Sequence, residues 1–145
     1  EKEPIRNLTR YSTFNGGVTW SQNGKQIAFL SERRGTGSLY VMDLEAPPAP
    51  LSGPKPATQP FTPINWAARA PLSIDFEDIH LRVTPLRAFA EEAAISPDGT
   101  KVAYRDRTTN DLWVATSNGN SNVRLTMGSM NPRQIVWSKR RSVLG

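Results

Sequence analysis

The sequence predicts an all-β fold, a partial β-propeller of about two complete four-stranded blades with flanking strands and a proline-rich insert. Two observations carry this prediction: an internal repeat with a period of 42 residues, and a glycine-containing turn at the same place in two of the copies. Four short strands at a period of about 40–45 residues are typical of a propeller blade. An open β-sandwich remains the alternative, although a sandwich needs no repeated sequence.

The repeat is visible in three apolar–Thr pairs, each followed by a large apolar residue and Ser. These pairs and their followers are Leu8-Thr9 with Trp20-Ser21, Val83-Thr84 with Ile95-Ser96, and Leu125-Thr126 with Trp137-Ser138. In every copy the large apolar residue lies 12 positions after the first member of the pair. The second and third copies are 42 residues apart and the first and second are 75 apart, which is the same period with 33 residues added.

Each unit is expected to contain four short strands, with a hairpin turn after the first. Asn23-Gly24 and Asp98-Gly99 supply the turns, because these residue types tolerate the positive φ that tight hairpins demand. The first strand ends at Trp20 or Ile95 and the second follows the turn. The third strands hold Leu39-Tyr40-Val41-Met42 and Leu112-Trp113-Val114-Ala115, and the fourth ends at the apolar–Thr pair. Apolar residues on both strand faces predict a sheet packed on both sides.

These spacings divide the whole chain, residues 1–145, into parts of one propeller segment. We expect residues 1–10 to form the last strand of a preceding blade, 17–86 a blade with an insert at 46–78, 91–126 a second blade, and 133–145 the start of another. An open stack leaves an unpaired blade face at each end. The segment should therefore need further blades of the same chain, or oligomeric neighbours.

The insert opens with eight prolines between Pro47 and Pro71, which is too many for regular structure. It is expected to be a surface excursion of polyproline or coil character. A passive linker is the simpler interpretation, and a loop that reaches a partner is the functional one.

Composition excludes several classes of function. There is no cysteine, so disulfides, thiolate nucleophiles and cysteine-based zinc sites are absent, and no apolar run approaches the length of a membrane span. The net charge of +5 is uneven: residues from Lys101 onward carry eight Lys and Arg against two Asp. These basic residues alternate with apolar ones, so we interpret them as a solvated sheet face rather than a nucleic-acid surface.

No combination of residues predicts catalysis or a cofactor. The single histidine, His80, lies near Asp75, Glu77 and Asp78, but no serine occurs in a nucleophile-elbow motif. The same four side chains could ligate a cation, yet apolar Phe76 and Ile79 interrupt them, so a structural turn is the preferred interpretation and no metal is expected. Neither a phosphate loop nor any other cofactor motif is present.

Two further features have structural explanations. Asp98 is placed like a catalytic acid, but its turn position accounts for it, because Asp caps its own backbone there. The aromatic residues Trp20, Trp137, Trp113 and Tyr40 could form a stacking platform, but beside Ile and Val at strand spacing they fit a core between sheets.

The first unit, W-S-Q-N-G-K-Q-I-A-F-L-S-E-R-R-G followed by L-Y-V-M-D-L, resembles the TolB-type, WD-repeat-like propeller unit W-S-P-D-G-K-x-I-A-F-x-S-x-R-x-G followed by L-Y-V-M-D. The second unit, I-S-P-D-G-T-K-V-A-Y with D-L-W-V-A, is similar to it as well. Residues 74–83, I-D-F-E-D-I-H-L-R-V, resemble a stretch in the propellers of tricorn-like peptidases. The structural residues of the repeat are Trp20, Asn23, Gly24, Ile95, Asp98, Gly99 and Trp137. Gln22-Asn23 replaces Pro-Asp in the first copy, and Ile95 replaces Trp in the second.

This resemblance implies a non-catalytic propeller that binds or gates polypeptides for a serine peptidase domain outside this chain. It favours a periplasmic or secreted location and leaves the cytoplasm open. A protein-interaction scaffold with no enzymatic role is the alternative. In the family the strand before the Ser-Pro-Asp-Gly turn lines the channel, so we expect Glu91, Glu92, Arg133 and Gln134 to face it and to contact a peptide.

Overall fold

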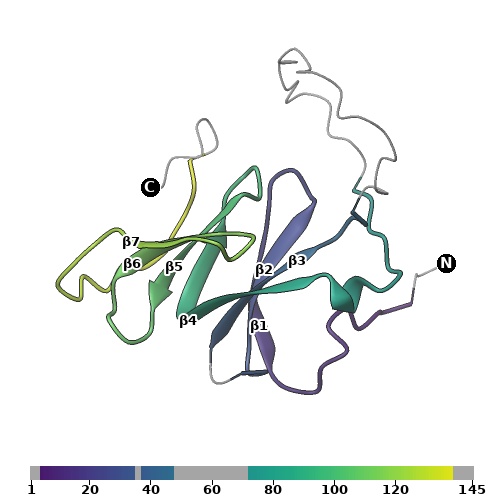
Figure 1. Cartoon of the computed structure of the whole chain (residues 1–145), viewed down its shortest axis with the longest axis horizontal. Helices are drawn as coiled ribbons and strands as arrows, with labels where there is room; N and C mark the ends of the chain where they lie inside the picture. The colour runs from purple at the N-terminus through teal and green to yellow at the C-terminus, as the bar shows by residue number, and fades with distance from the viewer. Residues whose placement is uncertain (1–3, 35–36, 48–71, 139–145) are drawn as a thin grey trace, which may run out of the picture.

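The computed structural model describes residues 4–34, 37–47 and 72–138, and it is an all-β structure as expected. Seven strands form one antiparallel sheet whose order follows the chain (Figure 1). The strands are β1 (Asn15–Trp20), β2 (Gln26–Ser31), β3 (Ser38–Asp43), β4 (Val83–Ile95), β5 (Lys101–Asp106), β6 (Leu112–Thr116) and β7 (Asn122–Arg124). A single turn of 3-10 helix, η1 (Ile79–Leu81), precedes β4. In this part of the chain no helix is long and apolar enough to cross a membrane.

Strand β4 joins two halves of the sheet. Residues up to Phe89 pair with β3, and residues from Ala90 onward pair with β5. We call β1–β3 with residues 83–89 the N-terminal half-sheet, and residues 90–95 with β5–β7 the C-terminal half-sheet. Figure 1 shows β4 bending as it passes from the blue N-terminal strands to the green C-terminal ones.

The bend coincides with an irregularity in the β3–β4 ladder. Tyr40 pairs with Pro85 and Ser38 pairs with Phe89, so two steps along β3 correspond to four along β4. Arg87, within the extra length, has a φ of 53°, in the left-handed region. Bulged residues bend a strand and increase its twist, which allows one half-sheet to turn over the other.

Apolar side chains cover both faces of each half-sheet. The central core lies between the half-sheets and joins Ala28, Leu39, Val41, Leu86, Ala88, Ala90, Ile95, Val102, Tyr104 and Ala115. On the far side of the N-terminal half-sheet, Ile27, Phe29, Tyr40, Met42, Leu44 and Ile79 form an outer core against Leu8, Ile74 and Val83. On the far side of the C-terminal one, Ala94, Ala103 and Ile135 pack with Leu112, Val114 and Trp137. Packing on both sides was predicted from the apolar patterns, and the structure confirms it.

Both predicted turns form, and they use the same hydrogen bonds. In the first, Ser21 Oγ donates to Asn23 Oδ1 over 2.7 Å and accepts from the Gln26 N–H over 3.0 Å. In the second, Ser96 Oγ donates to Asp98 Oδ1 over 2.6 Å and accepts from the Lys101 N–H over 3.0 Å. Gly24 and Gly99 supply the positive φ, 72° and 77°. These shared contacts explain why Ser, Asn or Asp, and Gly recur at this spacing.

The structure differs from the sequence-based expectations at β4. The Val83-Thr84 pair begins this strand instead of ending one, and the strand continues through residues 87–90, which were expected to separate two units. The local pattern could not reveal this, because the change of partner depends on β3 and β5. Residues 4–10 and 133–138 contain no strand, and residues 48–71 of the expected insert lie outside the described residues.

Truncating Ile95 tests whether the central core holds the half-sheets together. Ile95 is 4% exposed and packs in this core. We expect Ile95→Ala to lower the free energy of unfolding by about 2–5 kcal/mol and Ile95→Val by about 0.5–1.5 kcal/mol, measured by urea denaturation. Val18→Ala in β1, where the side chain is 55% exposed, is the control and should change it by less than about 0.5 kcal/mol. Equal small effects at Ile95 and Val18 would contradict this packing.

Candidate functional site

The predicted site residues Glu91 and Glu92 lie at a second irregularity of β4. Ala90 pairs with Asp106 and Glu92 with Arg105, so Glu91 is an extra residue in the ladder. Its carboxylate forms an ion pair with Arg105, with Oε2 2.7 Å from Nη2. Because bulges redirect side chains at strand edges, the local backbone accounts for two adjacent glutamates with different surroundings.

Glu92 holds the segment that carries the other two predicted residues. Its Oε1 accepts a hydrogen bond of 2.8 Å from the Ile135 N–H, and Trp137 Nε1 donates to the Ala94 carbonyl over 2.8 Å. Arg133 and Gln134 directly precede Ile135 and are exposed. The structure therefore brings the 133–134 segment next to the part of β4 that carries the two glutamates, although no hydrogen bond or ion pair joins the four side chains.

Sequence reasoning missed the residue that organises this region, Asp111. Its carboxylate is fully buried and accepts hydrogen bonds from Thr126 Oγ1 over 2.9 Å and from the Ser129 and Met130 N–H groups over 3.2 Å each. It also pairs with Arg124. Asp111 therefore fixes the loop that leads to the 133–134 segment. The groups that donate to it lie 13 to 19 residues away, so no local motif indicates this role.

The ionisation of Asp111 follows from these contacts. Burial opposes the charged form, but the hydrogen bonds from Arg124, Met130, Thr126 and Ser129 outweigh it and lower the pKa from 3.8 to about 2. The carboxylate is therefore charged at neutral pH and serves as a structural acceptor, not as a proton donor.

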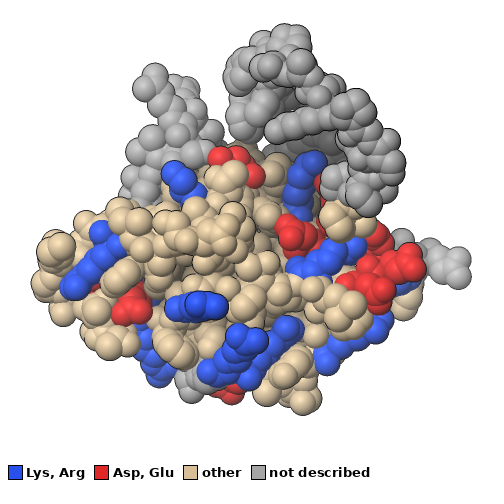
Figure 2. All heavy atoms as spheres, viewed as in Figure 1, with Lys and Arg blue, Asp and Glu red and all other residues tan. Residues whose placement is uncertain are grey.

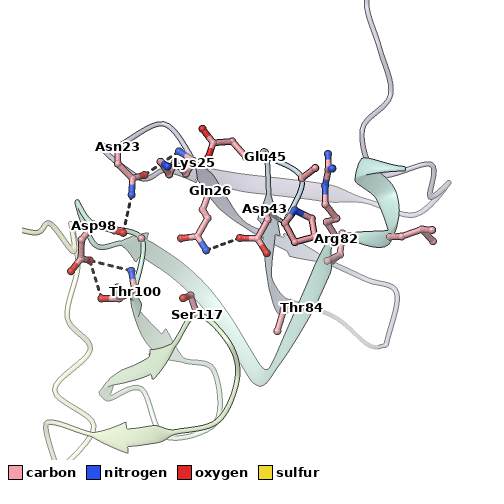
Figure 3. A pocket seen from close by; sticks show the side chains of 15 residues that line it. Asn23, Lys25, Gln26, Asp43, Glu45, Arg82, Thr84, Asp98, Thr100 and Ser117 are labelled. Carbon is pink, nitrogen blue, oxygen red and sulfur yellow. Dashed lines mark hydrogen bonds and ion pairs between the residues drawn. The ribbon is translucent and has the colours of Figure 1, made fainter. Parts of the chain in front are cut away.

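A cleft of about 470 Å³ opens where the two hairpin turns meet the beginning of β4 (Figure 3). One wall carries Gln26, whose Nε2 donates to Asp43 Oδ1 over 2.7 Å, and the ion pair of Lys25 with Glu45 at 3.0 Å. The facing turn contributes Asp98 and Thr100, and Asn23 Nδ2 bridges the turns by donating to the Asp98 carbonyl over 2.9 Å. These polar groups bind one another, so the walls of the cleft consist of internal hydrogen bonds and ion pairs.

Asp98 acts as the cap that its turn position predicted. Burial opposes its ionisation, but hydrogen bonds from Ser96 Oγ, the Thr100 N–H and Thr100 Oγ1 lower its pKa. All three bonds end on Oδ1 of the same carboxylate. The backbone and hydroxyls of the turn thus account for its charge.

The acidic run near His80 forms a turn around Arg82. Asp75 accepts from the Glu77 N–H over 2.9 Å and pairs with Arg82 Nη1 over 3.1 Å; these contacts, the backbone bond first, lower the pKa of Asp75. Across residues 4–34, 37–47 and 72–138, no three His, Asp or Glu side chains lie together as a metal site would require. The structural turn predicted here fits these contacts.

The four aromatic residues considered as a stacking platform are divided among different clusters. Tyr40 is stacked on Phe29 in the N-terminal outer core, with ring centroids 5.8 Å apart. Trp113 packs against the central core and Trp137 against the C-terminal outer core, while Trp20 is 48% exposed. The core role predicted for Tyr40, Trp113 and Trp137 is therefore consistent with the structure.

Charge is mixed on the face shown in Figure 2, where Lys and Arg are spread among Asp and Glu. No protein-family model matches the sequence, and no curated protein matches it either. The functional interpretation therefore depends on the residues and their geometry.

The buried carboxylate of Asp111 makes stability depend on acid. Its folded pKa of about 2 lies below the ordinary value of 3.8, so the stabilisation is complete above about pH 4 and is lost as pH falls from there towards 2. We expect Asp111→Asn to lower the melting temperature at pH 7 and to reduce the dependence of stability on pH between 2 and 4. Glu45→Gln, which removes an exposed carboxylate, is the control. An Asp111→Asn protein with the unchanged acid profile would contradict this role.

Proposed function

We propose that this chain is a non-catalytic β-propeller module, of the TolB-like or tricorn-like type, that binds or gates polypeptides for an associated serine peptidase domain. In this proposal the two half-sheets are two successive blades, and β1 and the second part of β4 are their innermost strands. The repeated Ser–Asx–Gly turns and the face-to-face central core support this interpretation. The family and its activity are inferred from the sequence motifs.

One observation carries the polypeptide-binding part of the proposal. The Glu92–Ile135 hydrogen bond holds residues 133–135 against the second part of β4, and there Glu91, Arg133 and Gln134 leave carboxylate, guanidinium and amide groups open to solvent. The side chain of Glu91 is 40% exposed in spite of its ion pair. Groups of both charges with an amide suit a polypeptide, whose backbone offers donors and acceptors and whose ends carry opposite charges.

Polypeptide binding can be tested with a fluorescently labelled, unstructured peptide and the full chain. We expect the double variant Glu91→Gln/Arg133→Gln to raise the Kd by roughly fivefold and to weaken its dependence on salt, because exposed charges contribute up to about 1 kcal/mol. Lys25→Gln/Glu45→Gln removes a charge pair in the cleft of Figure 3 and should leave the Kd unchanged. Equal affinity of all three proteins, or no binding by the wild type, would refute the proposal.

A protein-interaction scaffold is the second candidate, favoured by apolar side chains exposed in and after β7. Val123, Leu125, Met127, Met130 and Val136 are each at least half exposed, and the first two line a hollow of about 420 Å³ beside Trp137. The occupant proposed here is a second copy of the chain, joined through the same face.

Sedimentation equilibrium distinguishes the scaffold from the peptide-binding module. Concentration-dependent dimers that Val123→Glu/Leu125→Glu abolishes, and that Glu91→Gln/Arg133→Gln leaves intact, would support the scaffold. A monomer at all concentrations would exclude a scaffold that binds a second copy of the chain.

A further inference from the structure

A second hollow, apart from the proposed polypeptide site, lies over the irregular part of the β3–β4 ladder. Its volume is about 290 Å³, and its lining residues are Arg34, Ser38, Leu39, Tyr40, Pro85, Arg87, Ala88 and Phe89. The extra residues of β4 between Pro85 and Phe89 move the two strands out of regular pairing at this point. The local backbone thus accounts for the space.

The hollow combines cationic groups with an apolar wall. Arg34 and Arg87 are exposed, and neither guanidinium has a hydrogen-bond or ion-pair partner among the described residues. No acidic residue lines the space, and Phe89, Pro85 and Ala88 provide apolar surface. A ligand with a negative head and an apolar body would satisfy both features.

Tyr40 also lines the hollow. It is 3% exposed and its hydroxyl is fully buried, so a ligand in the hollow would not reach that hydroxyl. The guanidinium of Arg33 lies 5.4 Å from the centre of the same ring and adds positive charge nearby.

The backbone conformation of Arg87 also supports a role for its side chain at the hollow. Its φ of 53° is unfavourable for an L-residue, and glycine would adopt it at lower conformational cost. What arginine adds at this position is its side chain at the rim of the hollow.

We propose that this hollow binds a small carboxylate attached to an apolar body. The two arginines would donate to the carboxylate oxygens in the forked geometry that suits them. A single negative charge is favoured over a doubly charged phosphate, because the desolvation penalty rises steeply with charge in a small, largely apolar space. This proposal is independent of the polypeptide site.

Calorimetric titration of the full chain with 3-phenylpropionate tests the proposal directly. We expect saturable binding at one site, no binding of 3-phenylpropionamide, and weaker binding of inorganic phosphate. Arg34→Gln/Arg87→Gln should weaken binding by at least about tenfold, because hydrogen bonds to charged groups contribute more than neutral ones. Arg10→Gln changes an exposed arginine elsewhere in the same half of the chain and should bind like the wild type.

Tyr40→Phe is a second control. It removes a fully buried hydroxyl that the ligand does not reach, so we expect the affinity of the wild type. The proposal would be overturned if the wild type binds no carboxylate, if the amide binds as well as the acid, or if the double arginine variant binds like the wild type. Phosphate binding as strong as that of 3-phenylpropionate would overturn the apolar part of the site.

Discussion

The fold depends on one strand that belongs to two half-sheets. Because β4 pairs with β3 along its first part and with β5 along its second, neither half can be placed without the other. The bulge around Arg87 lets the sheet turn over, and the four β4 side chains of the central core then lie between the layers. A regular strand would leave the two halves side by side, with the apolar face of each open to solvent. The irregular backbone is thus the condition for burying the core.

The hairpin turns add a second link between the halves. The Asn23 N–H donates to the Pro97 carbonyl over 3.1 Å, and Asn23 Nδ2 donates to the Asp98 carbonyl over 2.9 Å. An aspartate at position 23 would cap its own turn equally well but has no amide to donate. The departure from the Pro-Asp pattern in the first copy therefore has a structural reason: the side chain caps its own turn and also binds the next one.

Interactions between residues close in sequence were predictable, and those between distant residues were not. The repeat indicated both turns, the strands beside them and the packing on both faces, because each follows from residue types a few positions apart. The continuity of β4 was missed, since the change of its partner from β3 to β5 depends on strands that are distant from it in sequence. Asp111 was missed for the same reason. The loop after β7 brings its partners to it, and no residue beside it in the sequence indicates them. Glu92 was selected as a peptide contact, and the structure gives it an internal partner, Ile135.

The distribution of partners also bears on where ligands can bind. The carboxylates near the core are occupied: Asp111 by its loop, Asp98 by its turn, and Asp75 and Asp43 by Arg82 and Gln26. The chain carries a net charge of +5, and Arg34 and Arg87 are cations without partners beside a hollow. Because these four carboxylates have internal partners and the two arginines beside the hollow have none, a new anionic ligand finds a strong complement at those arginines. Affinity for anions should therefore be concentrated at the β3–β4 bulge, where the irregular backbone that allows the sheet to fold over also leaves room for a ligand.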